Sequence, residues 1–185
     1  MEDSAIIDLL FERSEEAVGE LYVRYGALCR RIAMNILGDE RDAEECVSDS
    51  LLALWNAVPP LRPDPLGSYL CRIVRNQALK RRRDNGAEKR RSSYDLALEE
   101  LADCLPDRET PEDALQARET ARYMNAFLET LDPESRALFI RRYWQGDSVQ
   151  NLADFLGTGR HNVTVRLSRI REKLKKYLIK QGVSL

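Results

Sequence analysis

Apolar residues recur at three- and four-residue steps along most of the chain, which is the period of an α-helix. One such stripe runs from Val18 to Ile36 and ends at Gly38, a residue type that commonly closes a helix. A shorter apolar group at Ser4–Phe11 predicts a helix before it. The alternation typical of strands does not occur over a useful length, so the pattern predicts an all-α protein.

The next two predicted helices are bounded by polar caps and prolines. Asp39 is placed to cap a helix that ends at Pro59, because proline cannot continue it. Ser68 is placed to cap a second helix, which runs to the basic tail Lys80–Arg83. Between them, Asn56–Ser68 contains four prolines and one glycine, and this composition predicts a stiff, extended loop.

The C-terminal half begins after a break in the helical period. Residues 84–109 lose the apolar stripe and predict an acidic linker with one short helix near Leu96–Leu101. Thr110 and Asp132 are each followed by proline, which is the signature of a helix start. We therefore predict two small helical domains, at residues 1–83 and 110–185, joined by the linker 84–109.

A short helix, a glycine turn and a longer basic helix close the chain. Ser148 caps the short helix, Gly157–Gly159 forms the turn, and the last helix runs from Arg160 to about Lys180. This order is that of a helix-turn-helix motif, whose second helix can enter the DNA major groove. The predicted inner residues of the last helix are Val163, Leu167, Ile170 and Leu174.

The outer face of that helix carries the candidate DNA contacts. At about 100° per residue, the residues opposite or flanking the apolar stripe are candidates for reading bases: His161, Thr164, Val165, Ser168 and Arg169. The basic residues around them suit phosphate contacts: Arg160, Arg166, Arg171, Lys173, Lys175 and Lys176. A helical hairpin with a solvated basic face is the alternative interpretation.

Charge is strongly segregated, although the net charge of the 185 residues is only −2. Residues 1–71 carry a net −8, residues 72–91 a net +7, residues 92–135 a net −9, and residues 136–185 a net +8. The last basic block covers the helix-turn-helix, and an excess of positive charge is what phosphate neutralisation requires.

The first basic block also suits nucleic acid. Arg72 and Arg75 lie on the predicted exposed side of the helix that ends in Lys80–Arg83, and the proline-stiffened loop precedes this helix. A rigid loop beside a basic helix fits single-stranded nucleic acid, whose bases can be held in pockets while charge follows the backbone. A solvated helix end or a localisation-type basic run remains open.

Several classes are excluded or disfavoured. The apolar runs are too short for a membrane span, and the acidic start at Met1 is unlike a secretory signal. The four cysteines are widely spaced, so we expect buried thiols in a reducing cytoplasm and no zinc site. With one histidine and no phosphate-binding glycine motif, we expect no enzyme, no catalytic residue, no metal and no cofactor.

Two segments together resemble a bacterial RNA polymerase sigma factor of the extracytoplasmic-function (ECF) group of the sigma-70 family. The segment LYVRYGALCRRIAMNILGDERDAEECVSDSLLALW at 21–55, with SYLCRIVRNQALKRRRDN at 68–85, resembles the family's region 2. The segment LDPESRALFIRRYWQGDSVQNLADFLGTGRHNVTVRLSRIREKLKKYL at 131–178 resembles region 4. The sequence departs from the family at Gly159, where a polar cap is usual, at Thr164, where lysine is frequent, and in its proline-rich loop.

The resemblance implies a transcription initiation factor that binds core RNA polymerase and promoter DNA. Region 2 would melt and capture the minus-ten element through Asn56, Arg62, Asp64, Ser68, Tyr69, Arg72, Arg75, Asn76 and Lys80. Region 4 would read the minus-thirty-five element through Arg160, His161, Thr164, Val165, Arg166, Ser168 and Arg169 and would meet the polymerase flap. The polymerase clamp helices would contact Asp42, Glu45 and Asp49.

The resemblance also implies a use for the linker and a further partner. The acidic linker would occupy a positively charged polymerase channel that leads to RNA exit. An anti-sigma protein is an expected partner, whereas membrane insertion and a small-molecule substrate are not expected. Two alternatives stay open: a stand-alone helix-turn-helix regulator, which leaves the proline loop and Lys80–Arg83 without a role, and a helical module that binds only protein.

Overall fold

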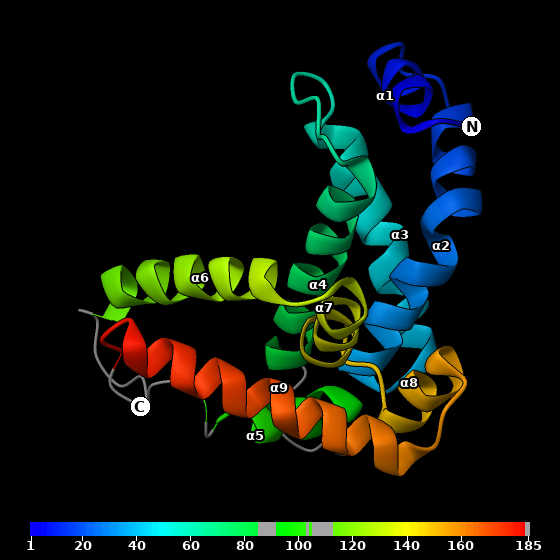
Figure 1. Cartoon of the computed structure of the whole chain (residues 1–185). Coiled ribbons are helices and arrows are strands. Elements are labelled where there is room, and N and C mark those ends of the chain that lie inside the picture. Colours follow the sequence, from blue (N-terminus) through cyan, green and yellow to red (C-terminus); the bar gives the residue numbers. More distant parts are fainter. Residues whose placement is uncertain (85–91, 103, 105–112, 184–185) are drawn as a thin grey trace. The chain divides into compact units, whose positions relative to one another are not determined.

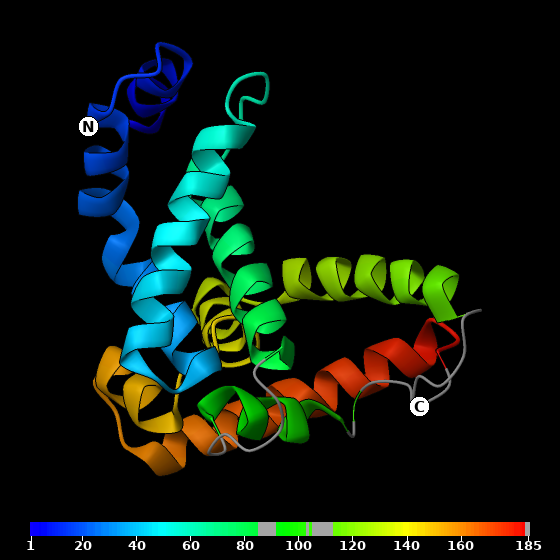
Figure 2. The same cartoon turned by 180° about the vertical axis from the view of Figure 1, so that it is seen from behind.

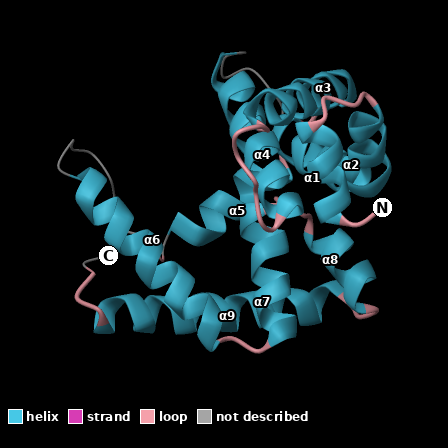
Figure 3. Cartoon of the chain, turned by 90° about the horizontal axis from the view of Figure 1, so that it is seen from above, coloured by secondary structure: helices cyan, strands magenta, loops and turns pink. Residues whose placement is uncertain are grey.

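The computed structural model describes residues 1–84, 92–102, 104 and 113–183, with the backbone alone for 113–118. Within these residues every regular element is a helix (Figure 3), so the all-α prediction is confirmed. The chain forms two compact units, Met1–Ser92 and Ser93–Leu185.

The first unit is a bundle of four helices: α1 (Asp3–Phe11), α2 (Glu16–Leu37), α3 (Glu40–Ala57) and α4 (Leu66–Asp84). Helices α2, α3 and α4 pack against one another in pairs (Figures 1 and 2), and α1 lies on α2 and α4. The apolar stripe predicted for α2 is buried at Leu21, Cys29 and Ile32. This stripe is what holds the bundle together.

The predicted caps form at both ends of the α2–α3 connection. Gly38 closes α2 with φ 71°, a left-handed conformation that glycine adopts without strain, and its N–H donates to the Met34 carbonyl at 2.8 Å. The Asp39 carboxylate accepts from the Asp42 N–H at 2.9 Å and begins α3. These short contacts set the reversal of the chain between the two helices.

Helix α4 begins earlier than predicted. The sequence predicts Ser68 as its N-cap, but the helix begins at Leu66. The first carbonyl to accept a helical bond is that of Pro65, from the Tyr69 N–H at 3.2 Å. Proline is favourable at this boundary because its fixed φ suits a helix start. The loop between α3 and α4 is therefore shorter than predicted, and Ser68 lies in the first helical turn.

The second unit contains α5 (Ser93–Ala102), α6 (Asp113–Thr130), α7 (Pro133–Phe139), the π-helical segment η1 (Ile140–Trp144), α8 (Val149–Leu156) and α9 (Arg160–Lys180). The start predicted at Thr110 lies outside the described residues. The start at Asp132 is confirmed, because its carboxylate accepts from the Ser135 N–H at 2.9 Å. The helix predicted to continue to Gly146 instead widens after Phe139, so that the Gln145 N–H donates to the Ile140 carbonyl at 3.0 Å.

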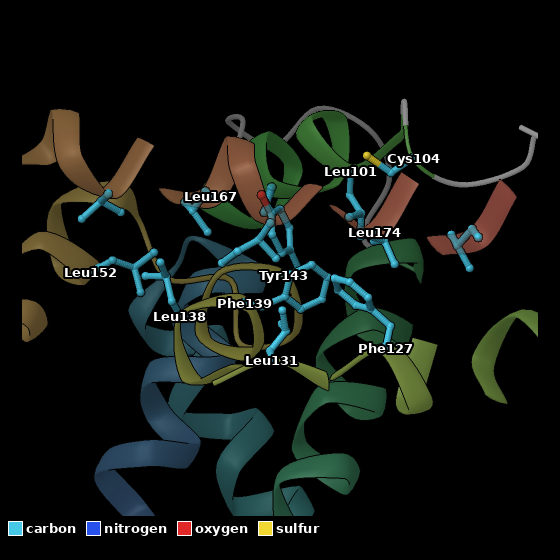
Figure 4. Packing of buried hydrophobic residues seen from close by; sticks show 14 of the residues in the cluster. Leu101, Cys104, Phe127, Leu131, Leu138, Phe139, Tyr143, Leu152, Leu167 and Leu174 are labelled. Carbon is cyan, nitrogen blue, oxygen red and sulfur yellow. The ribbon is translucent and has the colours of Figure 1, made fainter. Parts of the chain in front are cut away.

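One apolar core holds the second unit together (Figure 4). Phe139 and Tyr143 lie at its centre with ring centroids 4.6 Å apart, and Leu174 of α9 is buried in the same core. Helix α5 contributes Ala97 and Leu101 to this core. The division into 1–83, 84–109 and 110–185 stays a prediction, but residues 93–102 of the predicted linker form a helix that packs within the second unit.

Gly67 offers a test of the packing at the start of α4. A Cβ at Gly67 would lie 2.6 Å from Cε1 of Tyr25, whose hydroxyl donates to Asp3 at 2.6 Å and is held there. We expect Gly67→Ala to lower the free energy of unfolding by about 1–3 kcal/mol, as overpacking does. Urea unfolding followed by circular dichroism measures this change.

Gly19 is the matched control for this substitution. It lies inside α2, and a Cβ added there would have no neighbour within 4 Å. Gly19→Ala should therefore raise the free energy of unfolding, by about 0.5–1 kcal/mol. Equal effects of the two alanines would contradict the close approach of α4 to Tyr25.

Candidate nucleic-acid interfaces

The helix-turn-helix predicted from the sequence is present in the second unit. The Ser148 hydroxyl accepts from the Asn151 N–H at 3.1 Å to begin α8, and Gly157 ends it with φ 61°. Helix α9 begins at Arg160 after Gly159, which supplies no side-chain cap. The predicted inner residues Val163, Leu167, Ile170 and Leu174 are all buried.

The opposite face of α9 carries the predicted base and phosphate contacts. Of the seven residues predicted to read the minus-thirty-five element, five are exposed: Arg160, His161, Thr164, Ser168 and Arg169. Val165 and Arg166 are half-buried. The Thr164 hydroxyl donates to the Arg160 carbonyl at 3.0 Å, within the helix. The five exposed residues therefore lie away from the buried stripe, whereas Val165 and Arg166 are partly covered.

Arg166 has a partner within the unit. Its guanidinium lies 2.8 Å from the Glu134 carboxylate of α7, and the hydrogen bond from Arg166 lowers the pKa of Glu134. Both side chains are partly exposed, so the pair is a weak surface ion pair. Separating this pair would therefore cost little free energy.

Arg171 differs from what the sequence suggested. It was expected to suit a phosphate contact, but it is half-buried and donates to Tyr143 Oη at 2.8 Å and to Glu100 Oε2 at 3.3 Å. Its charge therefore faces the interior of the unit. The helical period alone does not reveal this, because Glu100 comes from α5, about 70 residues away in sequence.

The predicted single-strand surface of the first unit lies along α4. Arg72, Asn76 and Lys80 are exposed and follow one another at four-residue steps, so they form a stripe on one face. Arg75 is half-buried beside them. The Arg72 guanidinium lies over the Tyr69 ring at 4.9 Å from its centroid, which places a stacking surface next to a positive charge.

The predicted base contacts from the loop side differ in their surroundings. Asn56 is exposed in the last turn of α3, and Asp64 and Ser68 are exposed near the start of α4. Arg62, by contrast, lies 2.9 Å from Asp8 and 4.4 Å from the centroid of the Phe11 ring. The loop is therefore attached to α1, a contact that no local sequence signal predicts.

The three acidic candidates lie on one face of α3, around a basic residue of α4. Arg81 lies 2.9 Å from Glu45 and 3.0 Å from Asp49, and it also donates to the Asp42 carbonyl at 3.4 Å. The three acidic residues line a hollow of about 430 Å³ together with Gln77, Lys80, Arg81 and Asp84. Sequence reasoning missed Arg81, because the packing of α3 on α4 brings it here.

Comparison with known proteins identifies both units. The family model for Sigma-70 region 2 matches residues 21–88, and that for Sigma-70, region 4 matches residues 119–174. The RNA polymerase sigma factor NccH of Alcaligenes xylosoxydans xylosoxydans is 30% identical over 180 residues, which cover 94% of this chain and 95% of that protein. The ECF RNA polymerase sigma factor SigL of Mycobacterium tuberculosis is 28% identical over 167 residues, which cover 89% and 90%.

The chain belongs to the ECF group of the sigma-70 family. As a sigma factor, it is a transcription initiation factor that directs RNA polymerase to promoters. A solved structure of CnrH in complex with the cytosolic domain of CnrY aligns with 96% of this sigma factor and 97% of that chain, at 23% identity and a TM-score of 0.45.

The family regions map directly onto the elements. Region 2 takes in most of α2 and all of α3 and α4, and region 4 runs from within α6 into α9. Helix α5 lies outside both regions. Over the part of the sigma factor that the structure describes, no helix is long and apolar enough to span a membrane, and no group of ligands could hold a metal ion.

A double-mutant cycle tests how firmly Arg81 is held. Glu45 and Asp49 are more than half exposed, so each contact with Arg81 is screened by water. We expect Arg81→Met and Asp49→Asn to show a coupling free energy below about 1 kcal/mol in urea unfolding. A coupling of several kcal/mol would show instead that the acidic face is locked within the unit.

Proposed function

We propose that the two units divide promoter recognition between them. The second unit reads the minus-thirty-five element as duplex DNA, and the first unit opens the minus-ten element and holds its separated strand. The observation that carries this proposal is that regions 2 and 4 occur in family order, each with an exposed basic helical face.

Duplex reading rests on the exposed start of α9. In helix-turn-helix proteins the N-terminal residues of the second helix contact base edges. Here that position holds Arg160, His161 and Thr164, with Ser168 and Arg169 one turn further along. Arg169 can form a bidentate contact with guanine, and one such contact contributes about 1–3 kcal/mol of discrimination. Val165 fits an apolar contact with a thymine methyl group.

Strand capture rests on the stripe of α4 and the loop before it. Holding an extruded base costs a few kcal/mol of lost stacking, which the protein must offset with stacking and charge. Tyr69 with Arg72 supplies a ring and a cation, while Arg75, Asn76 and Lys80 continue along the helix. Asn56, Arg62, Asp64 and Ser68 would contact bases from the loop side, and Arg62 would have to leave Asp8 to do so.

Polymerase docking uses the acidic face of α3. We assign Asp42, Glu45 and Asp49 to the polymerase clamp helices, as the resemblance implies. The three carboxylates surround an open hollow, and Arg81 neutralises them in part. A basic partner surface would compete with Arg81 for Glu45 and Asp49.

The remaining parts of the proposal concern partners and setting. We propose that the chain acts in the cytoplasm without catalysis of its own, and that an anti-sigma protein holds it inactive. We also propose that the acidic segments reduce DNA binding by the isolated chain until polymerase engages the first unit and the linker. Nanomolar sequence-specific binding without polymerase would contradict this last point.

Run-off transcription with core polymerase tests the division of labour. We expect the wild-type chain to support transcription from promoters that depend on two elements. Arg169→Ala should change which upstream elements are used, because it removes a base contact in the duplex. Arg75→Ala should reduce permanganate-detected opening several-fold while duplex binding by the holoenzyme changes little, because it acts on the separated strand.

Binding to core polymerase, measured by native gel shift, is the control for both variants. Neither residue lines the hollow at the acidic face of α3, so both variants should bind as the wild-type chain does. If the wild-type chain fails to bind core polymerase, the proposed function is wrong. If Arg75→Ala and Arg169→Ala have equal effects on every promoter, the division between the units is wrong.

A further inference from the structure

A carboxylate outside both family regions accepts hydrogen bonds from two arginines and a tyrosine of the second unit. Glu100 of α5 accepts from Arg142 Nη2 at 2.6 Å and from Arg142 Nε at 3.3 Å. It also accepts from Tyr143 Oη at 3.2 Å and from Arg171 Nη1 at 3.3 Å. Glu100 thereby joins α5 to η1 and to the recognition helix α9.

Arg142 makes this carboxylate necessary. Arg142 is only 2% exposed, and a guanidinium removed from water is strongly destabilising unless a carboxylate and hydrogen-bond acceptors surround it. Its remaining donor contacts are with the Asp147 carbonyl at 2.8 Å and the Ser93 carbonyl at 3.3 Å. One arginine of η1 therefore fixes the first turn of α5, the loop between η1 and α8, and Glu100 in a single arrangement.

Tyr143 extends the arrangement to Arg171. Its hydroxyl donates to Glu100 and accepts from Arg171 Nη1 at 2.8 Å. Burial raises the pKa of Tyr143 to about 12, so the phenol stays protonated and keeps donating at neutral pH. The Cys104 thiol, two residues beyond α5, donates to the Arg171 carbonyl at 3.7 Å, a second contact with the same turn of α9.

The position of Arg171 on α9 explains why this matters for DNA. Residues eleven apart on a helix lie three turns apart and nearly in line, so Arg171 shares its flank with Arg160. Arg160 is exposed on the face that we assign to DNA, whereas Glu100 and Tyr143 hold Arg171 inward. A phosphate contact from Arg171 would raise affinity for every sequence alike and would add no discrimination.

We propose that Glu100 is a positioning and specificity-determining residue for recognition of the minus-thirty-five element: it fixes α9 against η1 and withholds Arg171 from DNA phosphates. This inference rests on the proposed function of α9 as the duplex-reading helix. The proposal gives α5 a role in DNA recognition by the second unit, although α5 lies in the predicted linker. Arg171 becomes available to phosphate only when the charge of Glu100 is lost.

The test is the salt dependence of binding of the full chain to a fluorescent 30-base-pair duplex of scrambled sequence. One phosphate contact changes the slope of log affinity against log salt by about 1, which is roughly a fourfold change in affinity between 50 and 200 mM salt. Arg171→Met should leave the slope unchanged, while Arg160→Met, at an exposed phosphate candidate on the same flank, should reduce it by about 1. Glu100→Gln should increase the slope by about 1 as Arg171 turns to phosphate.

Two further variants separate positioning from simple loss of structure. Glu100→Gln with Arg171→Met should return the slope to the wild-type value, and Glu100→Asp, which keeps the charge, should show the wild-type slope. Thermal unfolding shows whether each variant is folded. If Glu100→Gln does not fold, the comparison of Arg171→Met with Arg160→Met still tests whether Arg171 is withheld from phosphate, and a reduced slope for Arg171→Met overturns the inference.

The contradicting results are specific to this inference. A folded Glu100→Gln variant with the wild-type slope would overturn it, and so would a reduced slope for Arg171→Met. Failure of the proposed function has a different signature. In that case Arg160→Met also leaves the slope unchanged, and run-off transcription by the wild-type holoenzyme is insensitive to the upstream element.

Discussion

The pairing of arginines with carboxylates inside each unit is the constraint that sets which positive charges the folded chain presents. Arg142 shows it most clearly, because a guanidinium that is 2% exposed cannot stay in the core without Glu100. Arg81 with Glu45 and Arg62 with Asp8 follow the same rule at the surface of the first unit, where each contact is weaker. The blocks of opposite charge along the sequence thus neutralise one another locally when each unit folds.

This local neutralisation decides which positive charges face outward. On α4 the exposed basic residues are Arg72, Lys80 and Arg83, and on α9 they are Arg160, Arg169, Lys173, Lys176 and Lys180. Arg81 and Arg171, which belong to the same basic blocks, are held by carboxylates instead. A net charge near zero is therefore compatible with two separate basic faces, and the arrangement limits how many phosphates each face can neutralise.

Helical period and capping chemistry act within one helix, and they make much of the fold predictable from the sequence. The all-α class, the caps at Asp39 and Ser148, and the buried stripe Val163–Leu174 follow from helical period and capping chemistry. Contacts that join distant segments did not follow, because period and capping describe one helix at a time. The pairing of Glu100 with Arg171, the attachment of Arg62 to α1, and the start of α4 at Leu66 depend on packing between helices.

We infer that each unit selects its own promoter element, so the bases that one chain selects should fall in two separate blocks. Sequencing the promoters that the wild-type holoenzyme transcribes from a library randomised across the whole upstream region measures this selection. We expect two blocks of enriched bases separated by a spacer of nearly fixed length. Arg169→Ala should alter the upstream block while leaving the downstream block as it was. A single enriched block, or a change in both blocks with Arg169→Ala, would show that the two units do not divide promoter recognition.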